Sequence, residues 1–284
     1  MRVRGMHPAD QTSGALPVPE GGRAEIIGRK AESLRWHQAI RKRESLLICG
    51  PAGIGKTALL SKVLAELPKD MARSVVSVDG WVGLQPFLRG LLQKLYEAGD
   101  STLRHQLRAE GVGAGGFKSW LKSRSTSRLK GALYRSMQMG SYWIFLDHLP
   151  PLTPAVGKVV RELVWMRNTP VYLVARGYGA KELGHAANTY WDDRQRLILC
   201  PLHESAAREL LELCICRCGL ARLNLDGFRE KVLSMSGYNP GVLVKMCELA
   251  AEPRYHYDSR IKTRLIHIDY LMSLNGGNAE SCTA

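Results

Sequence analysis

The segment GPAGIGKT, Gly50 to Thr57, constrains the fold of this 284-residue chain more than any other feature of its sequence. It fits the pattern G-x-x-x-x-G-K-[ST], directly follows the apolar run LLIC and opens the helical sequence ALLSKVLAEL. Glycines at these positions let the backbone curl until successive N–H groups converge on phosphate oxygens, and the N-terminus of the next helix favours negative charge. A strand–loop–helix unit of this kind, here called the P-loop, binds the phosphates of a nucleotide.

Two side chains of the P-loop have predicted roles in holding a nucleotide and its metal ion. Lys56 should neutralise the β- and γ-phosphates, and the Thr57 hydroxyl should ligate Mg²⁺. The Mg²⁺ shell also needs an acid on a neighbouring strand, and the run YWIFLD places Asp147 at such a strand end. The predicted ligands are therefore a nucleotide and Mg²⁺, with Thr57 and Asp147 at the metal. The predicted phosphate-binding residues are Gly50, Pro51, Ala52, Gly53, Ile54, Gly55, Lys56 and Thr57.

Five short apolar runs alternate with helical patterns along the first two hundred residues. The runs are nearly continuous in hydrophobicity, which is typical of strands that are covered on both faces. Alternation of such strands with helices predicts an α/β fold with a parallel sheet between layers of helices. The predicted strands are 46–49, 75–78, 143–146, 171–174 and 197–200, and the predicted helices are 29–43, 58–67, 84–98, 117–139 and 157–167.

The pattern changes on either side of this α/β region, which we place at residues 25–201. Residues 1–24 are rich in Pro and Gly and are expected to form a flexible arm. Three helical segments follow residue 202 and predict a small all-helical lid over residues 202–252, and residues 253–284 form a C-terminal extension. No apolar run approaches the roughly 20 residues of a membrane span, and no apolar segment follows the first charged residues, so we expect no membrane association and a cytoplasmic location.

Several segments, taken in order, resemble the AAA+ ATPases, and in particular the branch that contains the signal-transduction ATPases (STAND) and the origin-recognition-like ATPases. The segment IIGRKAESL, residues 26–34, is similar to the family's hh-G-R-x-x-E-x-L motif, and GPAGIGKT and WIFLD resemble its Walker A and Walker B motifs. The segment VYLVAR resembles the strand that carries a sensor-1 arginine, and SGYNPGVLVKMCELA resembles the G-x-P motif of the lid. The resemblance covers about residues 25 to 252.

This resemblance implies a sheet of strand order 5-1-4-3-2, followed by the helical lid, with ATP between them. It implies that Arg176 contacts the γ-phosphate, and that Arg29 and Pro240 lie at the nucleoside end. It also implies a nucleotide-dependent switch or motor that hydrolyses ATP to ADP and phosphate. The chain departs from the family directly after Asp147, where His148 stands in place of the usual acid, so we expect ATP to bind well and to be hydrolysed slowly.

The chain carries a formal net charge of +14, which favours an anionic partner. The segment 116–140 is basic, with Trp120 and Tyr134 among its cations, and no acid occurs between Glu110 and Asp147. It could contact DNA phosphates, or it could be a solvated helix face with its aromatic residues packed inward.

Two functions remain open at this point. One is a nucleic-acid-handling ATPase of the replication-initiator-like or transposition-helper-like kind, and the alternative is a STAND-type protein-interaction switch with slow or no hydrolysis. A degenerate relative that only binds nucleotide is a third. A protein partner and a homo-oligomer are also expected. The cysteines of CICRC, residues 214–218, lie in a helical pattern and are expected to pack in the lid, since metal sites prefer C-x-x-C spacing on a loop.

Overall fold

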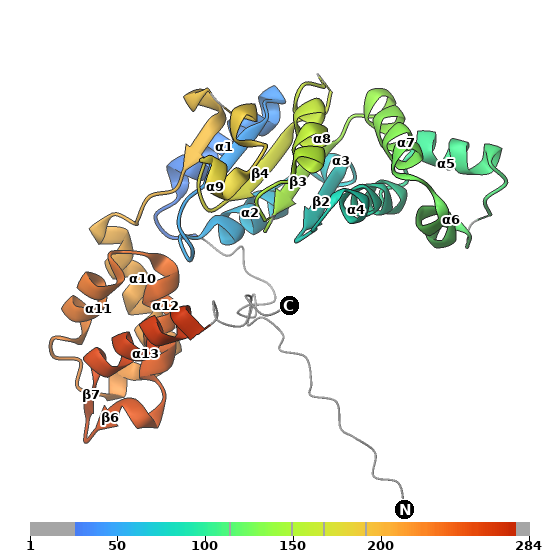
Figure 1. Cartoon of the computed structure of the whole chain (residues 1–284). Coiled ribbons are helices and arrows are strands. Elements are labelled where there is room, and N and C mark those ends of the chain that lie inside the picture. Colours follow the sequence, from blue (N-terminus) through green and yellow to red (C-terminus); the bar gives the residue numbers. More distant parts are fainter. Residues whose placement is uncertain (1–25, 114, 149, 167, 191, 277–284) are drawn as a thin grey trace, which may run out of the picture.

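The computed structural model describes residues 26–113, 115–148, 150–166, 168–190 and 192–276 (Figure 1). The predicted flexible arm at 1–24 and the last eight residues of the C-terminal extension lie outside this range. Five parallel strands form one sheet in the order β2-β3-β4-β1-β5, which confirms the predicted order 5-1-4-3-2. The strands are β1 (Leu46–Cys49), β2 (Val75–Asp79), β3 (Trp143–Asp147), β4 (Val171–Ala175) and β5 (Arg196–Ile198).

The two faces of the sheet bury different side chains of the same strands. In β4, Tyr172 and Val174 pack in the core on one face, and Val171 and Leu173 pack in the core on the other. Successive strand side chains point to opposite faces, so a sheet covered on both faces needs apolar residues at every position. Helices α1 (Lys30–Lys42) and α2 (Lys56–Ala65) contribute to the first core, and helices α4 to α8, within residues 84–164, contribute to the second. The near-continuous hydrophobicity of the strands follows from this arrangement.

Four of the five helices predicted in the α/β region are present, with bounds shifted by at most three residues. The single helix predicted over 117–139 is wrong, because Arg124 is extended and Ser125 starts a new helix by accepting the N–H of Arg128 at 3.4 Å. Helix α5 and the short helices α3 and α9 lie where no helix was predicted. The helices are α1 (Lys30–Lys42), α2 (Lys56–Ala65), α3 (Lys69–Ala72), α4 (Leu84–Glu97), α5 (Ser101–Ala109), α6 (Phe117–Ser123), α7 (Thr126–Met139), α8 (Pro154–Val164) and α9 (Ala180–Leu183).

The chain after residue 202 is helical apart from a two-stranded hairpin, and it has a core of its own. The C-terminal extension joins this core, since Tyr255 and Ile266 are fully buried in it. Cys214 and Cys247 are buried in the same core, so the packing role expected for the 214–218 segment is confirmed for Cys214. No helix in the described part of the chain is long and apolar enough to cross a membrane. The elements are α10 (Glu204–Arg217), α11 (Phe228–Ser236), α12 (Pro240–Ala250), β6 (His256–Tyr257), β7 (Arg260–Ile261) and α13 (Thr263–Gly276).

Candidate nucleotide site

The P-loop connects β1 to α2, as the sequence predicted. Gly53 and Gly55 have φ angles of 75° and 98°, in the region that L side chains rarely adopt, and Gly55 caps α2. The Lys56 ammonium folds back over the loop and donates to the carbonyl oxygens of Gly50 at 2.8 Å and Pro51 at 2.9 Å. The loop is therefore curled around the Lys56 charge at the N-terminus of a helix, an arrangement that suits a phosphate group.

The charge on Lys56 is only partly compensated by its surroundings. Burial lowers the pKa of Lys56, the Asp147 carboxylate opposes this shift, and the Arg176 guanidinium adds to it. A cation that is disfavoured by burial and by a second cation gains from an anionic ligand placed between the two. The electrostatics of the loop therefore fit the phosphates of a nucleotide.

Thr57 and Asp147 come together as the predicted pair at the metal. The Thr57 hydroxyl donates to Oδ2 of Asp147 at 3.1 Å, although the two residues come from α2 and the end of β3. Asp147 is only 6% exposed, and its Oδ1 accepts the N–H of His148 at 2.8 Å. A hydroxyl and a carboxylate are hard oxygen donors of the kind that Mg²⁺ prefers, so these residues fit a nucleotide-bound magnesium ion.

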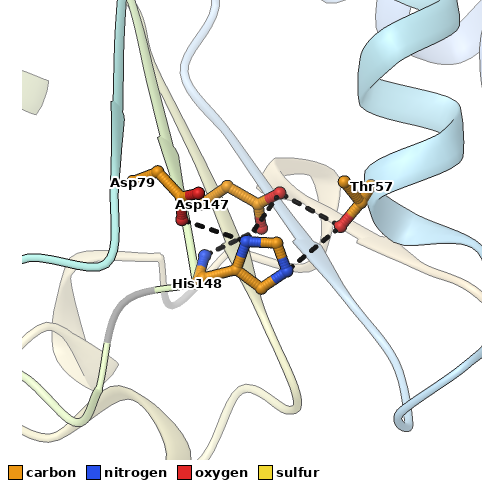
Figure 2. Close-up of polar contacts among 4 residues, drawn as sticks. All are labelled: Thr57, Asp79, Asp147 and His148. Carbon is orange, nitrogen blue, oxygen red and sulfur yellow. Dashed lines mark hydrogen bonds and ion pairs between the residues drawn. The ribbon is translucent and has the colours of Figure 1, made fainter. Parts of the chain in front are cut away.

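His148 lies beside this pair and is held on two sides (Figure 2). Its Nδ1 is 3.0 Å from Oδ1 of Asp79, at the end of the neighbouring strand β2, and 3.5 Å from Oδ2 of Asp147. Its Nε2 is 3.4 Å from the Thr57 hydroxyl. The backbone of His148 has a φ angle of 50°, a conformation that is uncommon for a non-glycine residue. The turn after β3 therefore directs the imidazole back over the strand ends rather than away from them.

A cavity of about 1030 Å³ opens beside these residues and collects further charged groups. Arg176 directly follows β4, is exposed and lines this cavity, where the resemblance placed a sensor arginine. Lys181 and Glu182, from helix α9, line it as well. The cavity thus joins the P-loop, Asp147, His148 and Arg176, which is the phosphate end of the predicted site.

Arg29 lies on the other side of the P-loop and is 4% exposed. Its guanidinium donates to the carbonyl oxygens of Ile54 at 3.1 Å and Cys200 at 2.6 Å, and it forms an ion pair with Glu32 at 2.8 Å. Arg29 therefore ties the P-loop to the chain that leaves β5 for the lid.

The lid contacts the P-loop through the N-terminus of α12. Asn239 caps α12, and its Nδ2 donates to the Ala52 carbonyl at 2.9 Å. The N–H of Gly241 donates to the Gly53 carbonyl at 2.9 Å. Pro240 stands between them, beside Gly55: a Cβ at Gly55 would lie 3.9 Å from its Cγ. The predicted lid residue Pro240 is thus placed against the loop that would hold the phosphates.

Asp79 and Asn239 are the site residues that sequence reasoning missed. Asp79 ends the apolar run VVSVD just as Asp147 ends WIFLD, and the parallel register pairs the two residues directly. An acid at the end of a second strand was therefore a usable signal. Asn239 precedes Pro240 as a typical helix cap, but no local signal indicates that its amide reaches Ala52, 187 residues away.

The basic segment 116–140 lies on α6 and α7, away from the cavity (Figure 1). Trp120 is 3% exposed and donates to Glu110, so it packs inward instead of offering a ring for stacking. Arg124 also pairs with Glu110, at 2.7 Å. Four cations of the segment remain exposed on α6 and α7: Lys118, Lys122, Arg128 and Arg135.

No family model matches the chain. A stretch of 77 residues is 34% identical to the human NACHT domain- and WD repeat-containing protein 1, covering 26% of this chain and 5% of that protein. The chain therefore spans a small fraction of the curated relative that it matches.

Solved structures resemble the whole fold at low sequence identity. A Walker-type ATPase of Pyrococcus abyssi matches with a TM-score of 0.58 and 12% identity over 90% of this chain and 75% of its own. The ORC1 protein of Aeropyrum pernix, solved in complex with DNA, matches with a TM-score of 0.52 and 14% identity over 87% of this chain and 66% of its own. A STAND protein of Pyrococcus horikoshii with a tetratricopeptide repeat sensor matches with a TM-score of 0.50 and 16% identity over 87% of this chain and 32% of its own. Because these sequence identities are low, the similarities are evidence about the fold alone.

Proposed function

Because the chain has the fold of the AAA+ P-loop ATPases, we propose that it binds ATP with Mg²⁺ and uses the nucleotide as a switch. The observation that carries this proposal is the meeting of Lys56, Thr57 and Asp147 around one cavity. These residues are brought together by a strand–loop–helix unit and a neighbouring strand, which is the arrangement that a nucleotide with its metal requires.

In this proposal each residue of the site has a distinct task. The P-loop amides and Lys56 hold the phosphates, Thr57 and Asp147 hold the metal shell, and Arg176 reaches the γ-phosphate from the end of β4. Bound Mg²⁺ would supply positive charge to the phosphate oxygens. We also assign Arg29 and Pro240 to the nucleoside end; Arg29 is bonded to the Ile54 carbonyl, and Pro240 lies beside Gly55.

We infer that the lid transmits the nucleotide state. The hydrogen bonds from Asn239 to Ala52 and from Gly241 to Gly53 join the N-terminus of α12 to the backbone of the P-loop. A change in the conformation of the loop must therefore be met by a movement of α12 or by the loss of these bonds. A partner protein, or a second copy of the chain, that binds the lid would sense that difference.

Hydrolysis in this site is expected to be slow. Phosphoryl transfer depends on positioning and electrostatics, and the acid that usually follows the Walker B aspartate is absent, with His148 in its place. We expect turnover well below the roughly 1 to 10³ s⁻¹ of typical enzymes in the isolated chain. Steady-state phosphate release tests this: Asp147→Asn should lower the rate, and His148→Glu should raise it. Turnover of tens per second in the wild type, unchanged in His148→Ala, would contradict the proposal for the site.

We further propose that the switch serves a nucleic-acid-handling process, supported by the net charge of +14 and the exposed cations of α6 and α7. Binding that neutralises phosphates weakens steeply with salt. Fluorescence anisotropy with labelled DNA should therefore show salt-dependent binding in ATP, weakened when Lys122 and Arg128 are both replaced by glutamine. Lys69→Gln with Arg73→Gln, on the surface helix α3 and the residue after it, is a matched control for the lost charge.

The STAND-type protein switch is the second candidate, and the local match to a NACHT-domain protein favours it. Two results together would favour this candidate. The chain should not bind DNA, and it should retain a protein from native lysate only in ATP or only in ADP. A chain that binds ATP without measurable hydrolysis would instead be a binding-only relative.

A further inference from the structure

Positive charge is concentrated on the helices that lie between β2 and β3 in the chain. Residues 84–140 contain ten Lys and Arg residues and three acids, and so carry half of the chain's net charge of +14. All three acids are engaged within this region, since Asp100 is buried and accepts from the hydroxyls of Ser136 and Tyr142, and each glutamate pairs with one cation. Those ion pairs are Glu97 with Lys94 at 2.9 Å and Glu110 with Arg124 at 2.7 Å. None of the three acids is therefore available to balance the other cations.

Four arginines on helices α5 and α7 are exposed and form no ion pair among the residues that the structure describes. They are Arg104 and Arg108 on α5 and Arg128 and Arg135 on α7. Residues one or two turns apart lie on the same face of a helix, so each pair of arginines shares one face. On α5 this face is opposite the buried Leu103 and Leu107. The two helices pack against each other on the side of the α/β region that is away from the lid (Figure 1).

A cavity of about 660 Å³ opens on this surface between α5 and the end of α7. It is lined from α5 by Arg104, His105 and Arg108 and by Ser101 and Thr102, and from α7 by Met139. No acid is among its described lining residues. Arg135 lies one turn before Met139 on α7, so the basic surface extends from the cavity along that helix. The cavity combines cations and hydroxyl donors without a negative group, which suits an anion.

The composition of the two helices distinguishes this surface from an ordinary solvated one. Solvated helix faces usually alternate cations with acids, but neither α5 nor α7 contains an acid at any position. A membrane-binding helix needs several apolar side chains beside its cations, and Met139 is the only exposed large hydrophobic residue described between residues 101 and 139. The planar guanidinium of arginine binds a phosphate through two parallel N–H bonds. These features together favour the phosphates of a nucleic acid.

We propose that the face formed by these four arginines binds the phosphodiester backbone of a nucleic acid, with the cavity beside α5 receiving one phosphate group. This inference rests on the proposed nucleic-acid function and assigns it to the surface of α5 and α7. Contacts to phosphates fix the position of a nucleic acid but carry no information about its bases, so binding at this face is independent of sequence.

The test measures how DNA binding by the full chain depends on salt. For a duplex, each phosphate contact adds about 0.9 to the slope of log affinity against log salt concentration. Arg104→Gln with Arg108→Gln should therefore reduce the magnitude of that slope by about 2 and lower the affinity in dilute salt about tenfold or more, measured by fluorescence anisotropy with a labelled duplex. Arg104→Lys with Arg108→Lys keeps both charges and should retain the slope. Arg41→Gln with Lys42→Gln removes the same charge from α1, on the opposite face of the sheet, and should leave the slope unchanged.

The outcomes separate this inference from the wider function. Circular dichroism and ATP affinity should match the wild type in every variant, because the arginines of α5 and Lys56 line different cavities. Wild-type affinity and slope in Arg104→Gln with Arg108→Gln would overturn the inference and leave the nucleic-acid function in place. A wild type that binds neither DNA nor RNA would overturn both. Binding to vesicles of anionic phospholipid that is lost in the same variant, without any binding to DNA, would assign the surface to a membrane and overturn the proposal.

Discussion

Replacing Gly241 by alanine would place a Cβ 2.6 Å from Cα and 2.7 Å from the carbonyl oxygen of Gly53. Both neighbouring atoms belong to the backbone of the P-loop, so no side chain can rotate out of the way. Non-bonded carbon atoms are comfortable at about 3.5–4.0 Å, so α12 and the loop must separate by about 1 Å. The substitution therefore forces the lid off the P-loop without replacing any residue that is predicted to bind the nucleotide.

The cost follows from the bonds that cross this junction. A separation of about 1 Å breaks the 2.9 Å bonds from Gly241 to Gly53 and from Asn239 to Ala52. At about 1 kcal/mol net for each hydrogen bond, docking of the lid should weaken by about 2 kcal/mol, or about 30-fold. Hydrogen exchange of the amide at position 241 should then be about 30-fold faster than in the wild type. If ATP binds only the docked form, its dissociation constant should rise by up to the same factor.

Gly131→Ala is the matched control, because nothing lies within 4 Å of a Cβ at this position in α7. That substitution should stabilise the chain by about 0.5–1 kcal/mol through helix propensity and leave the lid amides unchanged. Exchange at position 241 and ATP affinity that match the wild type in Gly241→Ala would refute the idea that the lid rests on the loop in solution.

Three further expectations follow from the site. Thr57→Ala should weaken ATP binding about tenfold in Mg²⁺ and leave it unchanged in EDTA; equal losses in both by calorimetry would exclude a metal role. ATP should raise the melting temperature and protect residues 238–246 from hydrogen exchange, whereas protection confined to 50–60 would show that the lid does not respond. Arg29→Ala should lower the free energy of unfolding by about 2–4 kcal/mol in urea denaturation, because two carbonyls lose a charged donor. Arg41→Ala, at an exposed position of α1, is the control. Equal effects of the two substitutions would contradict a structural role for Arg29.

The sheet was predictable because its strands carry their own signal. Most of the runs are apolar on both faces, as in VYLV, and several end at a polar residue or a glycine, as at Gly50, Asp79 and Asp147. The same applies to the P-loop, whose glycines, lysine and threonine are fixed by the local backbone path and the phosphate chemistry. The place of Asp147 in the site was predictable because it directly ends an apolar strand.

The remaining features depend on contacts that are distant in sequence or on weak local signals. The break between α6 and α7 depends on Ser125, whose capping role competes with an otherwise continuous helical pattern. The contact of Asp79 with His148 depends on the pairing of β2 with β3, 69 residues apart along the chain. The bond from Asn239 to Ala52 depends on how the lid docks, which hydrophobic periodicity does not specify.

The binding of ATP and Mg²⁺ at the P-loop is most directly tested by titrating nucleotide into the wild type and Lys56→Ala by calorimetry, with circular dichroism to confirm that both are folded. Charged hydrogen bonds are worth about 1.5–3 kcal/mol each, so loss of the ammonium group should weaken ATP binding by about 100-fold or more. Lys62→Ala, in the same helix but turned away from the cavity lining, should retain the wild-type affinity. Equal ATP affinity of folded Lys56→Ala and wild-type protein would contradict the P-loop as the nucleotide site.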